Sequence, residues 1–99
     1  MGYCNFKSGF SDDSVIAICN GVRVIQKRIP SGPQGTSYGE FFLASDGYNE
    51  FILELPEDGI RDEVSFVASP AAIPEIGANY DRLHREITFD FIYRAPRED

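Results

Sequence analysis

The stretch 17–28, AICNGVRVIQKR, places an Asn-Gly pair between two segments rich in β-branched residues. Asn and Gly best tolerate the positive φ that both central residues of a type I′ turn require, so Asn20-Gly21 predicts a two-residue β-hairpin. The loop length also fixes these opposing pairs: Cys19–Val22, Ile18–Arg23, Ala17–Val24, Ile16–Ile25, Val15–Gln26 and Ser14–Lys27. The turn therefore predicts structure, and it leaves open whether the face that carries Arg23, Ile25 and Lys27 meets the core or another protein.

Further short segments of strand character follow at close intervals. Asp46-Gly47 predicts a second hairpin, in which Phe42 faces Phe51 and the alternating residues Phe51, Leu53 and Leu55 point inward. The sequence also indicates a first strand at 3–6 and a short one at 64–68. The last predicted strand, EITFDFIYR at 86–94, alternates so that its apolar set points to the core: Ile87, Phe89, Phe91 and Tyr93.

Turn-forming and polar residues separate these segments. A loop is predicted at 29–37, an acidic turn at 56–63 and a polar end at 95–99. Two prolines and a glycine limit 69–85 to a short helical turn near 78–84. The whole pattern predicts one all-β domain over 1–99, a small antiparallel β-sandwich of about seven strands, with a partly open β-barrel as the alternative.

The charge balance narrows the classes of partner. Sixteen acidic and nine basic residues give a net charge of −7, which disfavours direct binding to nucleic acid and to anionic membranes. The chain has no apolar run of the roughly 20 residues that span a bilayer and no basic head followed by an apolar stretch. We therefore expect cytoplasmic synthesis, without membrane attachment, and a place in the cytoplasm, in a virion or in another assembly.

Residue types that carry chemistry are sparse. Cys4 and Cys19 are expected to be buried thiols, and His84, the single histidine, a surface residue before the last strand. No nucleophile motif, phosphate-binding loop or zinc-ligand spacing occurs, so no catalytic residue and no cofactor is predicted. Calcium stays open, because three acidic pairs fall in predicted loops: Asp12-Asp13, Glu57-Asp58 and Asp62-Glu63.

The absence of a catalytic pattern favours interaction over catalysis. Tyrosines near strand ends often anchor interfaces, and basic residues on a strand either protect its edge or contact a partner. The candidate interface residues are Arg23, Ile25, Lys27, Tyr38, Tyr48 and Tyr80. We expect a non-enzymatic protein–protein interaction module, a structural or accessory subunit of a homo-oligomer or larger assembly such as a virus or phage particle. The alternative is an acidic inhibitor or immunity protein that blocks a basic, nucleic-acid-binding groove of its partner.

Overall fold

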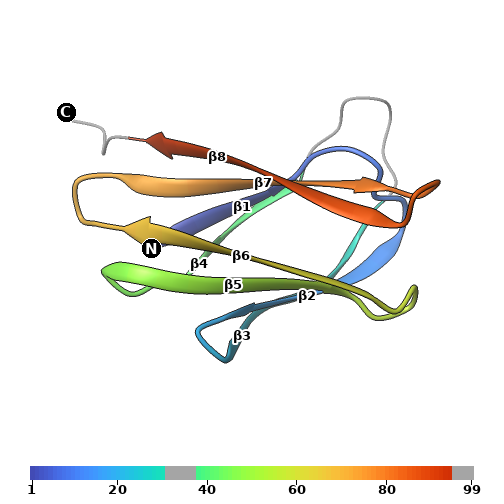
Figure 1. Cartoon of the computed structure of the whole chain (residues 1–99), viewed down its shortest axis with the longest axis horizontal. Helices are drawn as coiled ribbons and strands as arrows, with labels where there is room; N and C mark the ends of the chain where they lie inside the picture. The colour runs from blue at the N-terminus through green and yellow to red at the C-terminus, as the bar shows by residue number, and fades with distance from the viewer. Residues whose placement is uncertain (31–37, 95–99) are drawn as a thin grey trace.

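The computed structural model describes residues 1–30 and 38–94, which form eight strands in two four-stranded sheets. The strands are β1 (Gly2–Phe6), β2 (Asp13–Cys19), β3 (Val22–Ile29), β4 (Tyr38–Phe42), β5 (Gly47–Leu55), β6 (Ile60–Ala68), β7 (Ile73–Asp81) and β8 (Glu86–Arg94). One sheet has the order β4-β1-β7-β8 and the other β3-β2-β5-β6, with the strands running lengthwise through the molecule (Figure 1). The predicted β-sandwich is confirmed, and the two separate sheets form no closed barrel.

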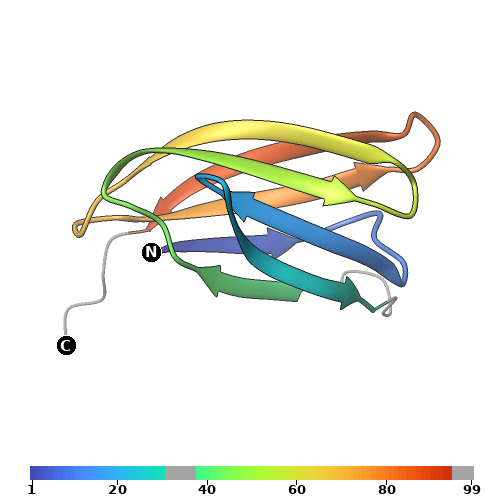
Figure 2. The ribbon, with the colours of Figure 1, turned by 90° about the horizontal axis from the view of Figure 1, so that it is seen from below.

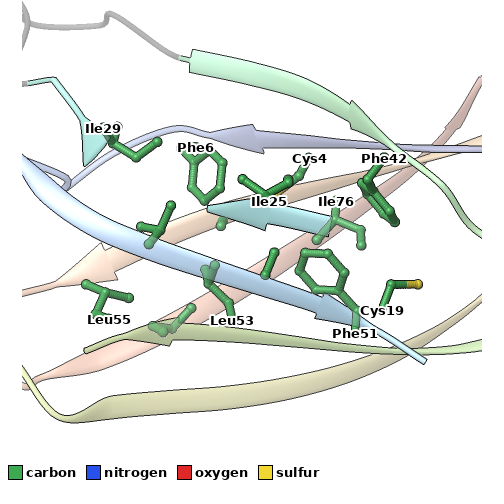
Figure 3. Packing of buried hydrophobic residues seen from close by; sticks show 14 of the residues in the cluster. Cys4, Phe6, Cys19, Ile25, Ile29, Phe42, Phe51, Leu53, Leu55 and Ile76 are labelled. Carbon is green, nitrogen blue, oxygen red and sulfur yellow. The ribbon is translucent and has the colours of Figure 1, made fainter. Parts of the chain in front are cut away.

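The core lies between the two sheets, where every second side chain of β2 and β5 is buried. Phe51, Leu53 and Leu55 are 0%, 0% and 1% exposed, which confirms their inward direction. Figure 3 shows these side chains packed against residues of the facing sheet, such as Phe6 and Ile76. Both cysteine thiols are free and buried in this layer, as expected from the sequence.

The Asn20-Gly21 hairpin is confirmed, since φ is 52° at Asn20 and 80° at Gly21. Its predicted register holds only next to the turn, because a β-bulge shifts the pairing after Ile18. The paired residues beyond the bulge are Ala17–Ile25, Ile16–Gln26, Val15–Lys27 and Ser14–Arg28. Val24 is the extra, unpaired residue of this bulge, and the side chain of Ile25 therefore points into the core. The predicted Ile16–Ile25 pair is wrong, because Ile25 faces the opposite sheet.

The second predicted hairpin is wrong. Asp46-Gly47 does form a bend, and φ at Gly47 is 91°, but β4 pairs with β1 and β5 pairs with β2 and β6. The chain therefore crosses between the sheets over residues 43–46. Phe42 and Phe51 still meet, with ring centroids 5.1 Å apart, because they face each other across the core. The same inward alternation suits a hairpin and a crossover, so it does not distinguish between them.

The helical turn predicted near 78–84 is also wrong, because β7 runs through Asp81 and supplies the eighth strand. It is a central strand between β8 and β1, and its pairing with β1 is the parallel exception in otherwise antiparallel ladders. Pro74 is tolerated there because the β1 ladder begins at Glu75, so β7 has only one neighbour at that position. Gly77 and Ala78 are buried, and small residues suit so crowded a site.

The bounds of the remaining predicted segments are close to those in the structure. The acidic turn shortens to 56–59, because β6 already begins at Ile60. The last strand is confirmed over 86–94, but burial fades along it: Ile87 is 3% exposed, Phe91 37% and Tyr93 52%. Of the loop predicted at 29–37, Ile29 belongs to β3. Its residues 31–37 lie outside the described residues. The polar end predicted at 95–99 lies outside them as well.

Candidate functional site

The loop carboxylates at one end of the sandwich lie beside arginines. The β1–β2, β5–β6 and β7–β8 connections meet at this end (Figures 1 and 2). Arg28 Nη2 lies 3.2 Å from Glu57 Oε2, and the Arg82 guanidinium contacts Asp13 and lies 4.0 Å from Asp58 Oδ2. Hydrogen bonds from the Ser14 backbone N–H and from Arg28 lower the pKa of Glu57. These carboxylates therefore have cationic partners within the fold.

A metal site finds no support at this end. Within residues 1–30 and 38–94, no three side chains of His, Cys, Asp or Glu are grouped so that they could hold an ion. Asp62 and Glu63, the third acidic pair, lie in β6 rather than in a loop. The same described ranges contain no helix long and apolar enough to cross a membrane.

The single histidine is a surface residue of the β7–β8 turn, as the sequence predicts. His84 Nδ1 lies 2.7 Å from Asp81 Oδ2, and this hydrogen bond raises the pKa of His84. Asp81 also accepts hydrogen bonds from the backbone N–H groups of Leu83 and His84, which shape the turn. The carboxylate thus orders the turn and holds the imidazole of His84 beside it.

The six candidate interface residues do not form one surface. Ile25 is 2% and Tyr80 5% exposed, so both belong to the core, and the Tyr80 hydroxyl donates to Asp58 Oδ2 at 3.1 Å. Arg23 and Tyr48 are exposed on different strands, β3 and β5. Their participation in an interface stays a prediction.

The other two candidates meet each other at the edge of the sandwich. Lys27 of β3 donates a hydrogen bond to the Tyr38 hydroxyl of β4, and its Nζ lies 4.0 Å from Glu40 Oε1. The hydrogen bond to Tyr38 raises the pKa of Lys27. Because β3 and β4 belong to opposite sheets, this polar seam joins the two layers along one side.

A hollow lined mainly by apolar side chains lies at the end of the sandwich opposite Arg28 and Arg82. Figures 1 and 2 place the N-terminus, the β2–β3 turn and the β4–β5 connection together at this end. The hollow has a volume of about 330 Å³, is open to solvent, and is lined by Met1, Val22, Arg23, Val24, Phe41, Phe42 and Leu43. Four of these side chains are exposed to an unusual degree for their type: Met1 at 56%, Val22 at 62%, Phe41 at 58% and Leu43 at 76%.

The floor of this hollow is held rigidly by the core. Phe42 is 4% exposed and its ring packs against Phe51 and Phe66, with centroids 5.1 and 6.0 Å away. Gly2 makes room for the ring, because a Cβ at Gly2 would lie 2.5 Å from Phe42 Cζ. On the rim, the Phe41 ring meets Tyr3 edge to face at 4.7 Å. The strand β4 thus supplies both the floor residue Phe42 and the rim residue Phe41.

A buried asparagine fixes the two loops that border the hollow. Asn49 donates to the carbonyls of Ser45 and Gly47 and accepts from the Ser45 N–H, at 2.8 to 2.9 Å. It also accepts from Asn20 Nδ2 at 2.8 Å, and the Glu50 N–H donates to Asn20 Oδ1 at 2.8 Å. The Asn20 side chain thus ties the β2–β3 turn to β5 beside the β4–β5 crossover.

One stretch of the sequence indicates this site. Phe41, Phe42 and Leu43 are three successive apolar residues, and a strand that buries one face must leave part of such a run exposed. Met1 and Val22 carry no such sign, because only the fold, through the β1–β4 pairing in the case of Met1, brings them together with β4. Asn49 was missed because a polar residue two positions after Gly47 is also an ordinary turn residue.

The hollow and the outer face of β5 and β6 differ in their charged residues. Arg23 is the single charged side chain that lines the hollow, and it donates to Gln26 Oε1 at 3.0 Å. Glu50, Glu54 and Glu63 lie on the outer face of β5 and β6. None of these three glutamates forms an ion pair within 4.0 Å in the part of the chain that the structure describes.

No family model matches the chain, and neither a curated protein nor a solved structure is found to be similar to it.

Proposed function

We propose that this protein is a non-enzymatic interaction module that binds an apolar side chain or short apolar segment of a protein partner in the hollow beside the Asn-Gly turn. It would act as a small structural or accessory subunit of a larger assembly, with the virus or phage particle among the settings. The observation that carries the proposal is the gathering of four exposed apolar side chains, Met1, Val22, Phe41 and Leu43, around one hollow. Small soluble domains rarely expose such clusters without a partner.

The shape and chemistry of the hollow indicate what it accepts. Its volume of about 330 Å³ is at the low end for ligand pockets, and it is open rather than enclosed. Such a site suits a protruding Leu, Met or Phe of another protein better than a small molecule that must be surrounded. Arg23 on the rim favours an acidic residue next to that apolar anchor.

The proposal is tested by affinity capture from a lysate of the source cells with three tagged chains. Leu43→Lys places a charge on the rim at a side chain that is 76% exposed, so the fold should persist. Val67→Lys is the matched control, because Val67 is 56% exposed and lies on β6, outside the hollow. Loss of a captured protein with Leu43→Lys but not with Val67→Lys supports the proposal. Equal capture by all three chains contradicts it.

The second candidate function, an acidic inhibitor of a basic groove, is favoured by Glu50, Glu54 and Glu63. Their carboxylates lie on one sheet face and form no ion pair within 4.0 Å among the described residues, although Arg61 lies opposite Glu54 in the ladder; the loop carboxylates are paired with arginines. Such a surface would bind a cationic partner in a manner that weakens steeply with salt. Replacing the three glutamates by glutamine should abolish that binding, while Leu43→Lys should leave it unchanged. Salt-independent binding would contradict this candidate.

A further inference from the structure

We propose that two copies of this chain associate through the free edge of β8, pairing antiparallel about a two-fold axis at Asp90. This surface is separate from the apolar hollow, and the inference does not depend on the function proposed for it. Four strands lie at the edges of the two sheets: β3, β4, β6 and β8.

Three of these edge strands carry a charged residue on the side that faces the core. The residues are Lys27 in β3, Glu40 in β4 and Asp62 in β6, and each lies opposite a fully buried partner: Val15, Cys4 and Leu53. A charge at such a position would be buried if a further strand paired with that edge. Lys27 and Glu40 are already engaged with each other across the β3–β4 seam. These three edges are therefore protected against pairing.

The fourth edge strand has no such protection. The core-facing residues of β8 are Ile87, Phe89, Phe91 and Tyr93, none of them charged. No strand pairs with the outer edge of β8 within the described ranges, and Figure 1 shows β8 at the margin of its sheet. Phe91, Ile92 and Tyr93 are 37%, 49% and 52% exposed, and the core-facing row of this edge is apolar throughout. An edge without an inward-pointing charge favours strand addition.

A second copy of β8 fits this edge in sequence and charge. With the two-fold axis at Asp90, all nine residues of each strand are paired, and the core-facing pairs are apolar: Ile87 with Tyr93 and Phe89 with Phe91. On the outer face Asp90 meets its own copy, and each Asp90 has Lys7 Nζ at 3.4 Å and Asn79 Nδ2 at 3.1 Å. One lysine therefore offsets each of the two facing carboxylates.

Sedimentation of the natural chain over a range of concentrations is the first test. We expect a species with twice the mass of the 11.1-kDa chain. Phe91→Lys should convert it to monomer, since it places a charge on the core-facing side of β8. Phe41→Lys is the control, because Phe41 is also exposed but belongs to β4 and to the hollow. A natural chain that stays monomeric at millimolar concentration, or a dimer that survives Phe91→Lys, overturns the proposal.

A single cysteine tests the position of the axis. The variant Asp90→Cys places two thiols opposite each other, and directly opposed Cβ atoms lie within about 5.5 Å, close enough for a disulfide after small adjustment. Thr88→Cys is the matched control, because Thr88 would face Ile92 of the second copy rather than its own equivalent. The natural cysteines are buried and should not interfere. A covalent dimer with Asp90→Cys alone supports the register, and covalent dimers of both variants or of neither overturn it.

Discussion

Replacing Asn49 by alanine should destabilise the fold more than any surface substitution. Asn49 is 0% exposed, and its amide makes four hydrogen bonds with nitrogen and oxygen atoms, two as donor to Ser45 O and Gly47 O and two as acceptor from Ser45 N–H and Asn20 Nδ2, besides a long one from the Cys19 thiol at 3.9 Å. These bonds hold the crossover from β4 to β5 and the hairpin turn next to it. Alanine removes all four at once and leaves a small polar cavity.

The loss in the free energy of unfolding depends on how far water can replace the hydrogen bonds that the partners of Asn49 lose. Each intramolecular hydrogen bond contributes about 1 kcal/mol to the free energy of unfolding, so four would give about 4 kcal/mol. Ser45 and Asn20 are exposed and Gly47 half-buried, so water can replace part of what is lost. We therefore expect a loss of about 2–3 kcal/mol, which for a chain of this size lowers Tm by about 10–20 °C.

Urea denaturation followed by far-ultraviolet circular dichroism measures this loss, with an unchanged m-value as the sign of a common unfolded state. Asn79→Ala is the matched control. Its side chain also has two partners, Asp90 Oδ2 at 3.1 Å and the Ser8 hydroxyl at 2.8 Å, but it is half-buried on the outer face of its sheet. The control should lose less than about 1 kcal/mol. Equal losses for the two variants would refute the role assigned to Asn49.

The remaining predictions concern titratable groups. The hydrogen bond that His84 donates to Asp81 raises the pKa of His84 above 6.5, and the same contact lowers the pKa of Asp81 below 3.8. The contact therefore stabilises the fold between the two values, is lost as pH rises through the raised pKa of His84, and is lost as pH falls through the lowered pKa of Asp81. An NMR titration should show the raised histidine pKa, with a return towards 6.5 in Asp81→Asn; identical titrations in both chains would contradict this. Burial raises the pKa of Cys4 to about 12 and that of Cys19 upward as well, so a thiol reagent at pH 8 should label neither until urea unfolds the chain. Rapid labelling of Cys4 in native buffer would show that its burial is incomplete.

The local features of the fold were predictable, because each depends on residues close together in sequence. Asn20-Gly21 specifies its own turn, and the alternation in 51–55 and 86–94 specifies which face is buried. The pairing of β4 with β1 was not predictable in this way. The inward side chain of Phe42 packs on Phe51 whether the two strands share a sheet or face each other, so the alternation is the same for both topologies.

The strand β7 and the bulge show a different limit. Ile76, Ala78 and Tyr80 do alternate, but Gly77 and Pro74 weaken the strand signal, and the neighbours that make such small residues suitable come from distant parts of the chain. The bulge at Val24 places Ile25 opposite Ala17, where Ile25 is 2% exposed. Its consequence for the candidate site was large, since it moved Ile25 to the core and placed Val24 beside the hollow.

The parallel pairing of β1 with β7 sets an order for folding during synthesis. The strands β2, β3, β5 and β6 all lie between Asp13 and Ala68, so their antiparallel sheet has all of its partners before β7 leaves the ribosome. The first strand made, β1, is by contrast an inner strand of its sheet, and one of its two neighbours arrives only with Glu75 and the residues after it. A nascent chain that stops short of β7 therefore holds one complete layer whose apolar face has only β1 and β4 to cover it. The core of this domain therefore closes only after β7 and β8 have been synthesised.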